Sequence, residues 1–184
     1  LMEIVKSFKN VKLVKYLFIV LTGSILLAIS SKIKIPFYPV PMTMQTFIVL
    51  FIGIAFGWKL GVATVSLYLF EGLMGLPVFS GTPEKGLGVV YFTGPTMGYL
   101  IGFIITVYLA GKFNYDGSLV RTFFKLTFAT SFIYILGLIW LGSLIGWDKP
   151  IFQLGAQPFL FAELCKILLI TLTANQIKKF RKII

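Results

Sequence analysis

The sequence contains no histidine and a single cysteine, Cys165. Without histidine, the chain lacks the commonest metal ligand and the usual proton carrier near neutral pH. One cysteine excludes an internal disulfide, thiolate clusters and haem attachment motifs. The six acidic residues are scattered, and no nucleophile elbow or Walker A motif is present. We therefore expect no metal site, no cofactor and no enzymatic activity.

Charged residues are scarce as well, at 12% of 184 residues, whereas 58% are hydrophobic and the mean hydropathy is +0.94. Soluble domains carry about 25% charged and about 45–50% apolar residues. The composition predicts an integral membrane protein, and the length suits one domain, residues 1–184, with about five to seven spans. The basic start leads into an apolar run without a clear small-residue cleavage site, so we expect no signal peptide.

Apolar runs separated by glycine, proline and charge predict an all-α bundle of six transmembrane helices. The second and third runs are short for a hydrocarbon core of about 30 Å, which indicates helices that are kinked or packed behind loops that enter the membrane. The expected helices cover residues 14–31, 42–57, 59–73, 95–110, 119–145 and 158–177.

With six spans, both termini lie on the same side of the membrane. The lysine and arginine residues of the connections and termini then divide unequally between the two sides. Twelve lie on the side of the termini: Lys6, Lys9, Lys12, Lys15, Lys59, Lys112, Arg121, Lys125, Lys178, Lys179, Arg181 and Lys182. Four lie on the opposite side: Lys32, Lys34, Lys85 and Lys149. The positive-inside rule then predicts cytoplasmic termini for a multi-pass protein of the cell membrane. Basic residues that flank apolar runs, rather than forming one dense patch, argue against a nucleic-acid partner.

The connections on the side opposite the termini are rich in glycine, proline and aromatic residues, and the longest covers residues 72–94. Long ordered loops often form lids or binding loops, although such a loop can also simply cover helix ends. We expect Phe79 and Tyr91 of this loop, with Trp140 of the fifth helix, to wall a small-molecule site. The alternative is that these aromatic side chains belong to the core or to an interfacial belt.

Glu163 and Lys166 lie inside the sixth apolar run, three residues apart and hence on one helical face. A charge at the middle of a membrane costs about 2.5–3.5 kcal/mol, so the pair is expected to face the bundle interior and a ligand. A self-neutralising ion pair is the alternative. Gln45 and Thr43 would add polar groups from the second helix, unless Thr43 only caps that helix. Glu71 is expected to reach the membrane interface.

Ser24 and Ala28 form a small-xxx-small pattern on the first helix, widened by Gly23. Such patches let helices approach closely. The pattern suits a contact with a partner protein and packing within the bundle equally well.

Four stretches together resemble the biotin-transporter subunit family, BioY: "PVPMTMQT" at 39–46, "GLMGLPVFSG" at 72–81, "GPTMGYLIGF" at 94–103 and "YILGLIW" at 134–140. The resemblance implies a six-helix substrate-binding (S) subunit of an energy-coupling factor (ECF) transporter. Such subunits bind their vitamin near the outer face, beneath loops. Their partners are a transmembrane coupling protein and two ATP-binding-cassette ATPases, and Ser24 and Ala28 resemble the contact with the coupling protein.

The sixth helix departs from the family pattern, which has Pro-Gly-Asp followed by a lysine three residues after the aspartate. Here the matching residues are Phe161, Ala162, Glu163 and Lys166, so the lysine is kept and glutamate replaces aspartate. Pro83, Glu84 and Lys85 stand where the family's loop usually has glycines.

The expected function is capture and uptake of biotin. Glu163 with Gln45 would serve the polar ureido ring, aromatic residues the apolar ring, and Lys166 the anionic end, although the residues leave open which end Lys166 meets. The alternatives are an S subunit for another vitamin or a biotin precursor, a membrane enzyme, and a small channel.

Overall fold

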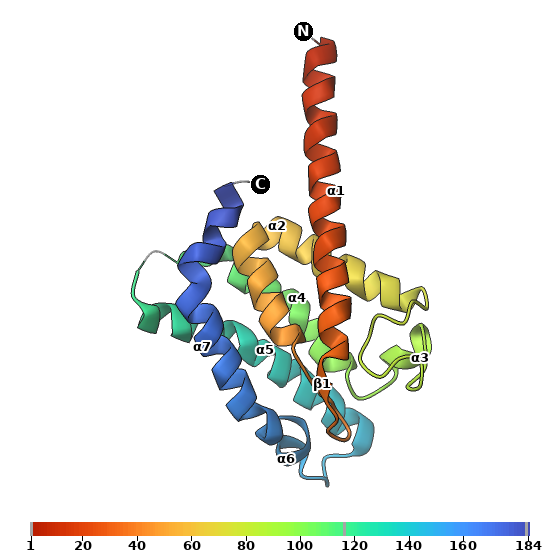
Figure 1. Ribbon diagram of the computed structural model, residues 1–184. Helices are drawn as coiled ribbons and strands as arrows, with labels where there is room; N and C mark the ends of the chain where they lie inside the picture. Colours follow the sequence, from red (N-terminus) through yellow and green to blue (C-terminus); the bar gives the residue numbers. More distant parts are fainter. Residues whose placement is uncertain (1, 116, 183) are drawn as a thin grey trace.

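A computed structural model describes the backbone of residues 2–115, 117–182 and 184, and the side chains of these residues except 2–11. The side chains of Lys6 and Lys9 therefore lie outside the described part. Helix α1 (Met2–Lys32) is a single helix that extends beyond the rest of the bundle at its N-terminal end (Figure 1). It begins earlier than the predicted residue 14, because no glycine or proline precedes Gly23 and the lysines there favour a helix.

A short hairpin follows α1 and was not expected in an all-α chain. Strand β1 (Lys34–Ile35) pairs antiparallel with β2 (Met42–Thr43), with Lys34 opposite Thr43. The prolines between the strands cannot continue a helix. We call the end of the bundle that carries this hairpin the hairpin end.

Helix α2 (Gln45–Leu73) contains a sharp bend at Gly57, where φ is 75° and ψ is 174°. Glycine adopts this conformation at little cost, and the bend interrupts the helical hydrogen bonds. Arg181 donates through Nε to the Ile54 carbonyl at 2.6 Å and through a guanidinium nitrogen to the Gly53 carbonyl at 3.0 Å. The predicted second and third helices are thus the two arms of α2. In Figure 1 the first arm rises from the hairpin and the second runs toward α3.

Helix α4 (Met97–Lys112) packs between α2 and α5 (Leu119–Ile145). Glycines allow the helix backbones to approach closely. A Cβ atom on Gly102 would lie 2.5 Å from the Ile133 Cα, and one on Gly111 would lie 2.4 Å from the Trp58 backbone nitrogen. These close contacts hold α4 between α2 and α5, so it is the central helix of the bundle.

The remaining elements complete the two ends. The loop after α2 contains the short helix α3 (Val89–Phe92), and α6 (Ile151–Gly155) and η1 (Gln157–Phe159) lead into α7 (Leu160–Ile177) and η2 (Lys178–Lys182). Both termini point toward the upper end of Figure 1, whereas the hairpin and α6 lie toward the lower end.

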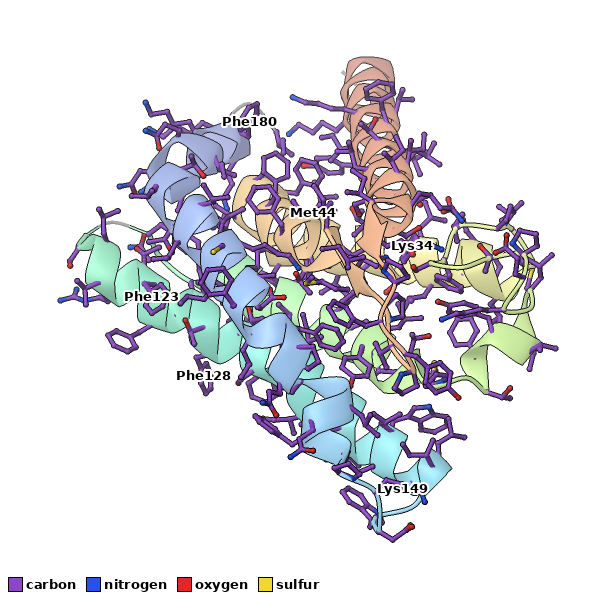
Figure 2. The ribbon with its side chains drawn as sticks, turned by 60° about the horizontal axis from the view of Figure 1, so that its bottom comes forward. Lys34, Met44, Phe123, Phe128, Lys149 and Phe180 are labelled. Carbon is purple, nitrogen blue, oxygen red and sulfur yellow. The ribbon has the colours of Figure 1, made fainter. Side chains whose placement is uncertain are left out.

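Four helical stretches of the described residues are long and apolar enough to cross a membrane, and α4 is a shorter apolar helix of 16 residues. The four stretches are Lys12–Lys32, Gln45–Leu73, Leu119–Ile145 and Ile151–Lys182. Their outward faces carry large apolar side chains such as Phe128, which is 56% exposed and points away from the ribbon in Figure 2. An apolar exterior of this extent suits contact with lipid and not with water.

Candidate ligand-binding site

A cavity opens at the hairpin end of the bundle, between β2 and the start of α2, the loop after α2, α4, α5 and α7. The volume it encloses is about 60 Å³, and its empty space reaches about 520 Å³ when the open mouth is counted. The lining residues are Val40, Pro41, Met42, Thr43, Gln45, Thr46, Ser80, Tyr91, Thr96, Tyr99, Leu100, Phe103, Ile133, Tyr134, Phe159, Glu163 and Lys166. The surface is mainly apolar and aromatic, with a few polar groups that point inward.

Glu163 and Lys166 lie on one face of α7 and are only 4% and 7% exposed. The Lys166 Nζ is 3.3 Å from the Glu163 Oε2. Both side chains line the cavity. The pair therefore faces the bundle interior and not the surrounding lipid, as its cost in hydrocarbon led us to expect.

Lys166 uses its three N–H donors within the protein. It donates to the Thr43 carbonyl at 2.7 Å, to the Thr46 Oγ1 at 3.0 Å and to the Glu163 Oε2 at 3.3 Å. The ammonium group thus fastens β2 and the start of α2 to α7. In this arrangement it has no N–H group left for an anionic ligand.

Glu163 has one occupied and one free carboxylate oxygen. Its Oε2 accepts hydrogen bonds from the Thr46 Oγ1 and the Tyr134 hydroxyl, both at 3.0 Å, in addition to the contact with Lys166. Its Oε1 is buried and has no hydrogen-bond partner among the described residues. A buried acceptor without a partner costs about 1–3 kcal/mol, and more when it is charged. This oxygen is therefore the natural acceptor for an N–H group of a ligand.

Ser80 provides a second free group on another wall of the cavity. Its Oγ is buried and unpartnered among the described residues, and the side chain is only 3% exposed. The third such atom in the described part, the Thr171 Oγ1, lies on α7 about two turns beyond Glu163 and outside the cavity. Both Glu163 of α7 and Ser80 of the loop after α2 thus line this cavity and carry an unpaired polar atom, and Glu163 also lines a second cavity between α5 and α7.

Gln45 and Thr43 both line the cavity, as expected. The Gln45 amide donates to the Tyr68 hydroxyl at 2.7 Å, which in turn donates to the Val78 carbonyl at 3.1 Å. The Thr43 Oγ1 donates to the Gln45 Oε1 at 3.2 Å and accepts from the Gln45 backbone N–H at 3.4 Å. The second contact reaches the first residue of α2, although the N-cap residue is Met44, so Thr43 both faces the cavity and supports the start of α2.

Only one of the three predicted aromatic residues reaches the lining. Tyr91 lines the cavity, and its hydroxyl donates to the Ser80 carbonyl at 2.9 Å. Burial raises the pKa of Tyr91, so this donor stays protonated. Phe79 lies behind Tyr91, with ring centroids 4.7 Å apart, because the small Gly72 leaves room for its ring against α2. Trp140 instead donates to the Gly94 carbonyl at 2.8 Å, so it fastens the loop to α5.

Tyr134 and Tyr99 line the cavity but were not predicted as site residues. Tyr134 bonds to Glu163, and the Tyr99 hydroxyl donates to the Gly155 carbonyl at 2.8 Å. A tyrosine within an apolar helix needs a partner for its hydroxyl. That need was the available signal in the sequence, although it does not identify the partner.

Ser24 is fully buried against α2, and its hydroxyl donates to the Glu71 carboxylate. Glu71 is half-buried near the end of α2, and its place at the membrane interface stays a prediction. Ser24 serves packing within the chain. Ala28 is half-buried on the same helix, and its contact with a partner stays a prediction.

These features define the class: a helical membrane protein with a partly enclosed cavity that contains a buried ion pair and, within the described residues, an unpaired carboxylate oxygen. The chain belongs to the BioY family, whose sequence profile matches residues 5–182.

Comparison with individual proteins gives the same family. The chain is 33% identical to the "Probable biotin transporter BioY" of Pyrococcus horikoshii, over 92% of this chain and 96% of that protein. It is 33% identical to the "Biotin transporter BioY" of Thermotoga maritima, over 84% of this chain and 90% of the relative. Its fold resembles a crystal structure of the S-component for biotin from an ECF-type ABC transporter, with a TM-score of 0.72, 26% identity, and 92% and 94% coverage of the two chains.

Proposed function

We propose that this chain binds biotin at the cavity of the hairpin end and acts as the substrate-binding subunit of an ECF-type transporter. The observation that carries the proposal is the buried, unpaired Oε1 of Glu163. Biotin offers two ureido N–H groups, and a charged acceptor in a partly enclosed site forms a strong hydrogen bond with such a donor. The apolar lining from α4, α5 and η1 suits the thioether ring.

A thermal-shift panel tests the choice of ligand. Biotin should raise the melting temperature of the purified chain, because a ligand at about 100 times its Kd stabilises the folded state by about 2.7 kcal/mol. Thiamin, riboflavin and folate should leave the melting temperature unchanged. A shift with desthiobiotin alone would support the alternative of a biotin precursor, and a shift with another vitamin would overturn the proposal.

The proposed topology has six spans with both termini in the cytoplasm. The two arms of α2 count as two spans, because Gly57 turns the chain at the end of the bundle away from the hairpin. The common position of the termini and the twelve basic residues on their side support this arrangement. The partners would be a coupling protein, contacted near Ala28, and two ATPases that supply the energy for uptake.

Sided labelling tests this topology in a Cys165→Ser background. A membrane-impermeant maleimide should label Lys149→Cys on intact cells, since Lys149 is exposed at the hairpin end. The Lys59→Cys variant, with its cysteine next to the bend of α2, should react only after permeabilisation. The opposite pattern would invert the topology.

A further inference from the structure

Three lysines from separate parts of the chain lie next to residues of the cavity wall without lining the cavity themselves: Lys32 at the end of α1, Lys34 in β1 and Lys85 in the loop after α2. The Lys32 Nζ donates to the Phe79 carbonyl at 2.8 Å and to the Thr82 Oγ1 at 3.1 Å, on either side of Ser80 and Gly81. The Lys85 side-chain carbons lie against Gly81. Lys34 stands opposite the cavity residue Thr43 in the hairpin, and Figure 2 labels it beside the end of α1.

The three ammonium groups differ in how they are used. Lys32 is tied to the backbone and hydroxyl oxygens of the loop, as Lys166 is tied to β2 and α7 deeper in the cavity. Within the described residues, the ammonium groups of Lys34 and Lys85 have no hydrogen bond or ion pair with a protein group. Of these three lysines, Lys34 and Lys85 are therefore the two whose ammonium N–H donors are available to a ligand.

The two free lysines also repel each other. Partial burial lowers the pKa of Lys85, and the nearby positive charge of Lys34 lowers it further. Glu84, an exposed acid of the same loop, is close enough to act electrostatically on Lys32 but forms no ion pair with the three lysines in the described part of the chain. An anion between Lys34 and Lys85 would relieve this repulsion.

We propose that Lys34 and Lys85 bind the carboxylate of the ligand at the cavity mouth, with the free Ser80 hydroxyl as a further donor. The inference rests on the proposed function and specifies the orientation of the ligand. The ureido ring would lie deep, at the free oxygen of Glu163, and the acid tail would point toward the hairpin end. The anionic end would then meet the two free lysines and not Lys166, whose donors are occupied.

A comparison of biotin with its neutral amide, biotinamide, isolates the carboxylate. The unsubstituted protein should bind biotin at least tenfold more tightly than biotinamide. The double variant Lys34→Ala/Lys85→Ala should lose at least tenfold in affinity for biotin, whereas its affinity for biotinamide should stay within twofold. Titration calorimetry measures both affinities, and binding of biotinamide also shows that the variant is folded.

Lys149→Ala is the matched control, because Lys149 is an exposed lysine of the hairpin end whose ammonium group is already paired, with Asp148 at 3.2 Å. It should keep the full preference for biotin. A second variant, Lys85→Glu, should weaken biotin more than biotinamide.

The outcomes separate the two proposals. If the unsubstituted protein binds neither compound, the proposed function fails and the carboxylate site fails with it. If it binds biotin and the double variant keeps the preference for the acid, the function stands and the role of Lys34 and Lys85 is overturned.

Discussion

Replacing Glu163 by glutamine is expected to weaken biotin binding by roughly 10- to 150-fold, which corresponds to the loss of about 1.5–3 kcal/mol for a hydrogen bond to a charged group. Two hydroxyls and the Lys166 ammonium already point at the Oε2 of Glu163. In Glu163→Gln the amide oxygen should therefore take that position, and the amide NH₂ should take the place of Oε1. A donor would then face the ureido N–H of the ligand.

Titration calorimetry on the purified proteins measures this loss. Asp148→Asn is the matched control, since Asp148 is an exposed acid that pairs with Lys149 and does not line the cavity. It should bind biotin like the unsubstituted protein. Unchanged affinity in Glu163→Gln would remove Glu163 from the site.

Replacing Lys166 by methionine is expected to lower the free energy of unfolding by about 3–5 kcal/mol, because it leaves the Glu163 carboxylate buried without its charged partner. The affinity for biotin should also fall tenfold or more. Lys166 connects the Thr43 carbonyl of β2 to α7, so its loss releases one wall of the cavity. Thermal and denaturant unfolding in detergent measure the stability.

The double variant Glu163→Gln/Lys166→Met distinguishes a charge effect from a packing effect. It should recover part of the lost stability, since the uncompensated charge is gone. Lys59→Met, at an exposed lysine over the Trp58 ring, should be nearly neutral. If the double variant is as unstable as the sum of the single variants, the ion pair does not account for the loss.

The helices could be predicted largely from apolar runs and their breaks. The predicted boundary between the second and third helices falls at Gly57, where the backbone turns. The hairpin could not be predicted, because its two-residue strands carry no periodicity. The N-terminal boundary of α1 was predicted incorrectly, because an apolar run shows which residues suit a membrane and not where the helix begins.

The charged pair of the site could be predicted from its cost in an apolar helix, and so could its inward orientation. The sequence does not tell which oxygen of Glu163 is free, since that depends on donors from α2 and α5. It also does not separate Tyr91, which lines the cavity, from Phe79, which packs behind it. These distinctions arise from tertiary packing between segments that are distant in the sequence.

The central claim is that the free oxygen of Glu163 accepts a ureido N–H inside the cavity. The most direct test is a structure of the chain with biotin bound. The account predicts a ureido nitrogen at about 2.7–3.2 Å from the Glu163 Oε1 and the biotin carboxylate toward Lys34 and Lys85. A ligand outside the cavity, or a carboxylate against Lys166 with the Glu163 Oε1 still unpaired, would contradict it.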